Sequence, residues 1–101
     1  MEELNKFLSV LEKRPLMYIG EYNINYLSMF IGGYIKGKEI DDYDKFGEFQ
    51  FWVMKYLELP RRSVGWAKVI DCYSASQKEA IEYFFELYKE WHKEEFGEDA
   101  W

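Results

Sequence analysis

The chain has 101 residues, of which 49% are apolar and 21% are aromatic, and 19 acidic side chains against 13 lysines and arginines give a net charge of −6. This length suits one domain with one core, the apolar content excludes an intrinsically disordered chain, and the negative charge disfavours a nucleic-acid partner. A single cysteine, Cys72, and a single histidine, His92, exclude an internal disulfide and a tetrahedral Cys/His zinc site, so we expect no cofactor or metal.

The N-terminal segment is acidic and amphipathic, which does not match a secretory signal peptide. The longest apolar stretch, Ile24 to Ile35, is too short to cross a bilayer and contains the polar residues Asn25 and Ser28. The lone cysteine favours a reducing compartment. We therefore expect a cytoplasmic protein without a membrane partner.

Apolar residues at three- and four-residue spacing predict a first helix over residues 2–13: Leu4, Phe7, Leu8 and Leu11. Pro15 should end this helix, because the residue before a proline avoids helical dihedral angles. We expect Met17, Tyr18 and Ile19 to form a buried connection that orients the next helix through Gly20. That helix should run over residues 24–37, with Asn23 as its N-cap and Gly37 near its end.

A third helix is expected to follow the acidic turn at residues 41–44, because Phe46, Phe49, Val53 and Leu57 fall at helical spacing. A partial alternation of apolar residues leaves a strand possible over residues 49–53. Pro60 marks the next boundary. Over residues 66–73, apolar side chains at helical spacing favour a short helix, with a buried strand as the alternative.

The clearest local signal is the capping box from Ser76 to Glu79, which predicts the start of the longest helix. This helix should run to about Phe96 and end at Gly97. Its predicted buried stripe consists of Ala80, Phe84, Leu87, Tyr88 and Trp91. Beyond it, Trp101 is expected either to dock or to fray. The sequence therefore predicts an all-α fold, a compact single-domain bundle of four to five helices with a long C-terminal helix.

Cys72 and His92 form the only potential pair of a thiol nucleophile and an imidazole base, and neither residue lies in a recognisable catalytic motif. Cys72 follows Asp71 in an otherwise apolar segment, so we expect a small buried core residue. His92 precedes Lys93 near the end of a charged helix, where a solvent-facing residue would complement the helix C-terminus. The sequence therefore indicates a protein that is not an enzyme.

No glycine-rich phosphate-binding motif is present, so nucleotide binding has no direct support. The G-x-x-x-G spacing from Gly33 to Gly37 more often allows helices of a soluble chain to approach closely. A carboxylate acid and base pair is an alternative that the number of acidic residues leaves open. Acidic residues at regular helical spacing, however, usually form a solvated face.

Negative charge is concentrated in the C-terminal part, where residues 74–101 contain eight carboxylates and three lysines, a net charge of −5. We name four of these residues the glutamate row, because they repeat every four residues: Glu82, Glu86, Glu90 and Glu94. This spacing predicts one acidic flank of the last helix. Like charges at this spacing destabilise an isolated helix by about 0.2–0.5 kcal/mol per pair, and a basic partner would relieve that repulsion. The alternative is a solvated face that neighbouring lysines screen.

A second acidic group surrounds the start of the third predicted helix: Asp41, Asp42, Asp44 and Glu48. These residues could cap the helix instead of binding a partner. Tyr83 and Trp101 are candidate anchors beside the glutamate row, since buried aromatic side chains supply most of the contact energy of an interface while charges steer the encounter. We therefore expect the two acidic groups and these two aromatic residues to include the partner-binding surface.

Two longer stretches cover about half of the chain, and they read KRPLMYIGEYNINYLSMFIGGY and GWAKVIDCYSASQKEAIEYFFELYKEW. They resemble small bacterial immunity proteins of polymorphic toxin systems, which include contact-dependent growth inhibition. The matching positions are Arg14, Pro15, Met17, Tyr18, Ile19, Gly20, Trp66, Phe84 and Phe85. Leu16 stands where the family usually has glycine, and a leucine disfavours a tight left-handed turn.

The resemblance implies a non-enzymatic inhibitor that binds a cognate toxin domain in the cytoplasm. An acidic surface suits a toxin that is a nuclease such as an RNase, because the cleft of a nuclease is usually electropositive. A generic acidic interaction module, or an antitoxin or adaptor of another kind, is the alternative. The string R-P-x-M-Y-I-G also occurs in the ATPase part of DNA gyrase B subunits, but the rest of that ATP site is not visible in this chain.

Overall fold

Six α-helices make up most of the computed structural model, which describes residues 2–38, 43–57 and 65–101. They are α1 (Glu2–Lys13), α2 (Pro15–Ile19), α3 (Ile24–Gly37), α4 (Tyr43–Tyr56), α5 (Trp66–Cys72) and α6 (Gln77–Phe96). No strand occurs in the described ranges, so the all-α prediction is confirmed and residues 49–53 and 66–72 are helical. The additional helix is the short α2, which lies where we expected a connection. Pro60, the predicted boundary, lies outside the described residues.

The segment between α1 and α3 follows from its proline, glycine and asparagine. Pro15 is the first residue of α2, a position where a helix does not need the missing N–H. Gly20 then ends α2 with φ at 79°, a left-handed conformation that favours glycine. Leu16 lies inside α2, so the left-handed turn of this segment falls at Gly20. Asn23 caps α3 as predicted, because its side chain accepts hydrogen bonds from two amides of the first turn.

The capping signals of α6 are also confirmed, with one change of partner. The Ser76 hydroxyl accepts from the Glu79 amide at 3.2 Å. The Glu79 carboxylate reaches back to the amide of Ala75 at 3.2 Å, one residue before the cap. At the other end, Gly97 adopts a left-handed φ of 72° and its amide donates to the Lys93 carbonyl oxygen.

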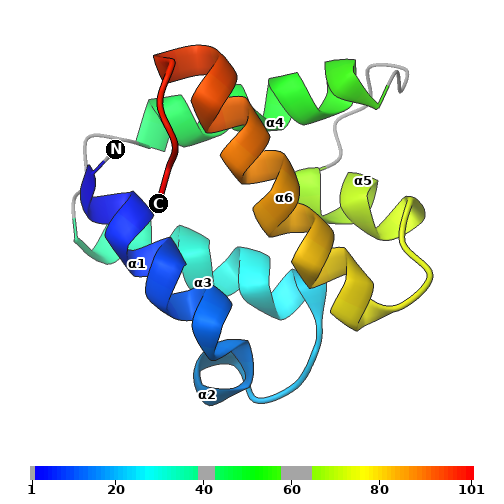
Figure 1. Ribbon diagram of the computed structural model, residues 1–101. Coiled ribbons are helices and arrows are strands. Elements are labelled where there is room, and N and C mark those ends of the chain that lie inside the picture. The colour runs from blue at the N-terminus through cyan, green and yellow to red at the C-terminus, as the bar shows by residue number, and fades with distance from the viewer. Residues whose placement is uncertain (1, 39–42, 58–64) are drawn as a thin grey trace.

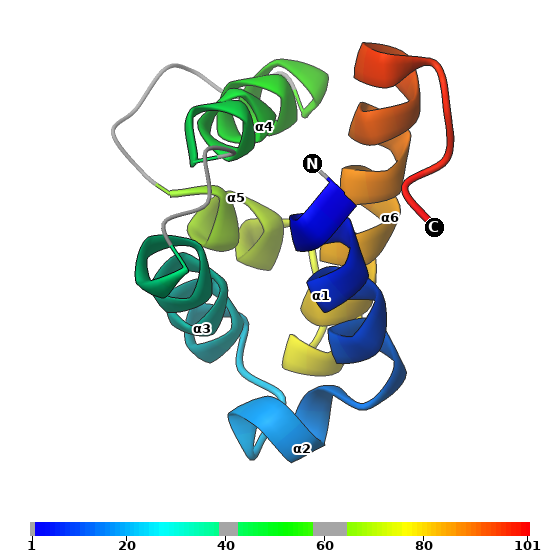
Figure 2. The same cartoon turned by 90° about the vertical axis from the view of Figure 1, so that its left-hand side faces the viewer.

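Helix α5 occupies the middle of the bundle. It packs against α3, α4 and α6, and both α3 and α4 also contact α6. In Figure 2, α3, α5 and α4 lie on one side of the molecule, α1 and α6 lie on the other, and α2 closes one end. Figure 1 shows that the N-terminal and C-terminal segments lie on the same side of α6. A seven-residue helix can hold this position because four of its residues are buried.

Phe49 of α4 lies at the centre of an aromatic cluster between α4, α5 and α6. Its ring is fully buried and has edge contacts with Trp66, Phe84, Tyr88 and Trp91, with centroids 5.5 to 6.3 Å apart. Aromatic pairs in this geometry contribute roughly 0.5–1.5 kcal/mol beyond the burial of their area. The cluster therefore fixes α4 and α5 against the predicted apolar stripe of α6, all five residues of which are buried.

Candidate partner-binding surface

The glutamate row turns around α6 along its length. Because an α-helix has 3.6 residues per turn, each four-residue step advances about 40° around the axis, and three steps advance about 120°. All four glutamates are exposed, but the two ends of the row face different neighbours. We name Glu82 and Glu86 the α2-side pair, and Glu90 and Glu94 the α4-side pair.

The α4-side pair is bound by aromatic side chains of α4. The indole Nε1 of Trp52 donates to Glu94 Oε2 at 3.1 Å. The hydroxyl of Tyr56 donates to Glu90 Oε1 at 3.5 Å. The two rings stack on each other with centroids 4.8 Å apart. These carboxylates therefore contribute to holding α4 on α6.

Lys45 adds an ion-pair contact between the same two helices. Its Nζ lies 3.3 Å from Glu48 Oε2 and 3.4 Å from Glu95 Oε1. The hydrogen bond to Glu48 and the charge of that residue, followed by the hydrogen bond to Glu95, raise the pKa of Lys45. Of the second acidic group, Glu48 is thus paired. Asp41 and Asp42 lie outside the described residues, as does the side chain of Asp44.

Tyr83 lies half-buried on α6 and interacts electrostatically with Tyr56 of α4. Burial, followed by the charges of Tyr56, Glu86 and Glu90, raises the pKa of its phenol. The pKa of Tyr56 is also raised, first by the charge of Glu90 and then by burial. Both phenols therefore keep their protons near neutral pH and remain hydrogen-bond donors beside the carboxylates.

The α2-side pair lines a hollow of about 490 Å³ between the end of α1, the start of α2 and the first half of α6. Pro15 and Tyr22 form part of its wall, and Ile81 and Phe85 supply apolar surface. Neither carboxylate of the pair has a hydrogen bond or an ion pair to any residue in the described ranges. Within the described part of the chain, both carboxylates are therefore exposed and without an ion pair.

Three lysines also line this hollow, Lys13, Lys78 and Lys89, and the last two contact other groups. Lys89 Nζ lies 2.9 Å from each carboxylate oxygen of Glu12. Lys78 Nζ lies 5.8 Å from the centre of the Tyr22 ring, a cation–π contact. The screening lysines that the sequence suggested thus do not form ion pairs with Glu82 or Glu86.

Trp101 docks against the flank of α6 that faces α1. Its ring lies 5.9 Å from Tyr88 and 6.2 Å from Phe85. Its Nε1 donates to Glu12 at 3.0 Å, and Lys89 lies over its ring at 5.2 Å. Of the two outcomes expected for the C-terminal segment, the structure shows docking, and 38% of the side chain stays exposed.

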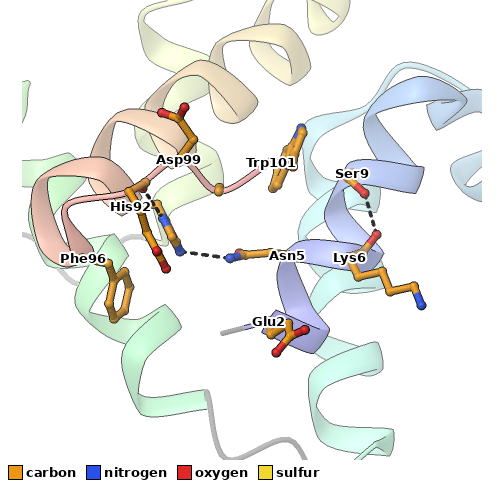
Figure 3. Close-up of a pocket in the computed structure, with 10 residues that line it drawn as sticks. Glu2, Asn5, Lys6, Ser9, His92, Phe96, Asp99 and Trp101 are labelled. Carbon is orange, nitrogen blue, oxygen red and sulfur yellow. Dashed lines mark hydrogen bonds between the residues drawn. The ribbon is translucent and has the colours of Figure 1, made fainter.

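A second hollow, of about 570 Å³, lies between α1 and the C-terminal segment (Figure 3). His92 lies in its wall, with Nε2 2.9 Å from Asn5 Nδ2 and Nδ1 2.9 Å from the Glu98 carbonyl oxygen. The asparagine amide nitrogen only donates and the carbonyl only accepts, so the imidazole hydrogen lies on Nδ1. Tyr88 completes the group by donating its hydroxyl to Asn5 Oδ1 at 2.6 Å.

This geometry corrects the expectations for His92 and Cys72. His92 is only 3% exposed, so the prediction of a solvent-facing residue is wrong. It follows Tyr88 by four residues and therefore shares the buried side of α6. Cys72 is exposed at the last residue of α5, so the predicted burial is also wrong. Both ring nitrogens of His92 are hydrogen-bonded, to Asn5 and to the Glu98 carbonyl oxygen.

Within residues 2–38, 43–57 and 65–101, no three histidine, cysteine or carboxylate side chains come together in a group able to hold a metal ion. None of the helices in these ranges has both the length and the apolar character needed to cross a bilayer.

An exposed apolar surface adjoins α2, and the sequence did not indicate it. We name it the α2–α3 face and define it by five residues around a shallow hollow of about 340 Å³: Tyr18, Ile19, Tyr26, Met29 and Phe30. Met29 is 74% exposed and Tyr26 is 45% exposed. The expected burial of residues 17–19 is wrong for Met17 and Tyr18, which are exposed, while Ile19 is half-buried.

Comparisons of the chain with protein-family models, with curated proteins and with solved structures found no match. A functional assignment therefore depends on the geometry and the chemistry of the surface.

Proposed function

We propose that the protein binds and neutralises a cognate toxin domain, a nuclease with a basic active-site region, as an immunity protein does. The observation that supports this function is the α2-side pair, because Glu82 and Glu86 are exposed and have no hydrogen bond or ion pair in the described ranges. The resemblance of two stretches of the chain to immunity proteins points to the same function.

The electrostatics favour this kind of partner. A nuclease must bind a polyanion, so its substrate cleft carries positive charge. Glu82 and Glu86 lie roughly 6 Å apart along the axis of α6, which presents two negative charges in sequence, as a phosphate backbone does. The chain carries a net charge of −6, which attracts a basic domain from a distance and speeds the encounter.

Co-expression tests the proposal directly. The toxin probe is the C-terminal domain of a large secreted protein, sought first in the gene immediately upstream of the one for this chain. We expect the chain to restore growth of cells that express this domain and to co-purify with it. Failure of both results would overturn the proposed function.

Charge reversal tests the surface. The double variant Glu82→Lys with Glu86→Lys should bind the toxin domain more weakly and should reduce the salt dependence of the affinity. The matched control reverses Glu3 and Glu98, which are exposed and lie outside the hollow, and it changes the net charge equally. Equal affinity of the two double variants would show that the α2-side pair has no specific role.

A further inference from the structure

We infer that the α2–α3 face is the apolar contact that holds the same basic toxin domain after the glutamates have attracted it. This inference rests on the proposed function and adds the place at which the partner docks. Single apolar side chains are common on protein surfaces, whereas an apolar group around one hollow typically marks an interaction site. The five residues of the face include no charged side chain.

The floor of the face is fixed by aromatic packing. The ring of Phe30 lies 5.7 Å from Phe7 of α1 and 5.9 Å from Tyr18 of α2. Phe7 in turn stacks on Tyr34 of α3, with centroids 3.7 Å apart and planes within 3°. Because these contacts come from three helices, the face is ordered before a partner arrives. A preformed surface loses less conformational entropy on binding than a flexible one does.

Tyrosine and methionine suit this contact chemically. A tyrosine ring buries a large area while its hydroxyl keeps a hydrogen bond, and such residues are enriched in interfaces. Methionine is flexible and polarizable, so it adapts to the shape of a partner. Tyr26 and Met29 therefore offer the two most exposed contacts of the face.

The net charge of the chain favours a basic occupant for the face. The segment from Pro15 to Tyr22 forms one wall of each of two hollows, because Pro15 and Tyr22 line the hollow of the α2-side pair while Tyr18 and Ile19 line the α2–α3 face. A domain that spans α2 meets apolar rings on one side and, on the other, Glu82 and Glu86, which have no ion pair in the described ranges and share their hollow with three lysines. A basic domain with an apolar projection fits both, whereas a second copy of this chain, at −6, is repelled.

The α2-side pair and the α2–α3 face should affect different rate constants of binding. Long-range attraction by the α2-side pair should act mainly on the association rate and on its salt dependence. Burial of the α2–α3 face should act mainly on the dissociation rate, as most short-range contacts do. The two surfaces can therefore be separated by measuring both rates at several salt concentrations.

The test uses charge-neutral substitutions on the full chain. Tyr26→Gln and Met29→Gln remove apolar contacts from exposed positions of α3 and leave the net charge unchanged. The matched control is Phe51→Gln on α4, where the ring is 69% exposed. We expect each variant of the face to dissociate from the toxin domain roughly tenfold faster or more, with an unchanged salt slope, and the control to match the wild type.

Oxidation of methionine by hydrogen peroxide provides a readout that does not depend on substitution. Met29 should oxidise readily in the free protein, and the toxin domain should protect it. Met54 is 7% exposed and supplies an internal reference for slow oxidation. Mass spectrometry of the free protein and of the complex measures both residues.

The outcomes separate this inference from the proposed function. If the wild type does not bind the toxin domain, the proposed function and the inference both fail. If the wild type binds while Tyr26→Gln and Met29→Gln dissociate at its rate, or Met29 stays unprotected, the inference alone is overturned. Sedimentation of the free wild type as a dimer that Met29→Gln dissociates would assign the face to a second copy and would also overturn it.

Discussion

The two ends of the glutamate row share residue type, spacing and exposure but have different environments. Trp52 and Tyr56 donate hydrogen bonds to Glu94 and Glu90, whereas Glu82 and Glu86 have no partner in the part of the chain that the structure describes. The cause is the advance of about 40° per four residues around the helix, which turns the row from α2 toward α4. A charge pattern therefore identifies a helix surface, but neighbouring helices determine which charges stay available.

The largest loss of stability is expected when the packing that places α4 beside α6 is removed. Phe49→Ala should lower the free energy of unfolding by about 3–5 kcal/mol, because it deletes a fully buried ring from the aromatic cluster. Denaturant unfolding measures the loss. The control is Phe51→Ala on the outer side of α4, which should stay within about 0.5 kcal/mol of the wild type. Similar losses for both variants would contradict the central place of Phe49.

A smaller effect concerns the flank of α6 that faces α1, where the polar contacts are buried instead of exposed. Asn5→Ala should lower the free energy of unfolding by about 1–3 kcal/mol, because it leaves the buried Nε2 of His92 without its donor. Asn25→Ala provides the control at an exposed position of α3. A loss at Asn5 no larger than that at Asn25 would show that water replaces the amide.

The two ends of the row can also be compared directly by stability. Glu94→Ala removes the acceptor of the Trp52 indole and should cost about 0.5–1 kcal/mol, a small value because the contact is exposed. Glu82→Ala removes no hydrogen bond to residues 2–38, 43–57 or 65–101 and should change the free energy of unfolding by less than about 0.5 kcal/mol. Thermal and denaturant unfolding of the two variants should therefore differ in this order. The reverse order would contradict the structural role of the α4-side pair.

The smallest effect is a shift in the alkaline titration of Tyr56. The charge of Glu90 raises its pKa in the folded state, so the folded protein holds this proton more tightly than the unfolded chain. That contribution to stability is present below the unfolded pKa and is lost as the pH rises through the folded pKa. Glu90→Gln should lower the pKa of Tyr56, as followed by NMR or by phenolate absorbance. Glu82→Gln is the control, and an unshifted Tyr56 in Glu90→Gln would refute the coupling.

Local signals in the sequence predicted most of the fold. Pro15, Asn23, Ser76 and Gly97 bound their helices where the structure places boundaries, because caps and breakers act within a few residues of themselves. The apolar stripe of α6 was also predicted, because the spacing of apolar residues is likewise a local pattern in the sequence. Helix α2 was missed, because five residues offer too little periodicity to distinguish a short helix from a connection.

The candidate site could not be predicted in full, because it depends on contacts between residues that are far apart in the sequence. The burial of His92 depends in part on Asn5, which lies 87 positions away in the chain. A signal was nevertheless present, since His92 continues the four-residue series of Phe84 and Tyr88. Cys72 lies two residues beyond Ile70 and so leaves the stripe of α5. The exposure of Tyr26 and Met29 depends on how α1, α2 and α3 pack, which spacing alone does not specify.

The link between Asn5 and the end of α6 bears on the order in which the chain folds as it is made. Synthesis proceeds from the N-terminus, so α1 leaves the ribosome before its partners at residues 88–101 exist. The Asn5 amide therefore stays hydrated until about 90 further residues have been added. The contacts of α1 with α6 therefore form late in synthesis, and a ribosome stalled before residue 92 should carry a first helix that lacks the Asn5–His92 hydrogen bond.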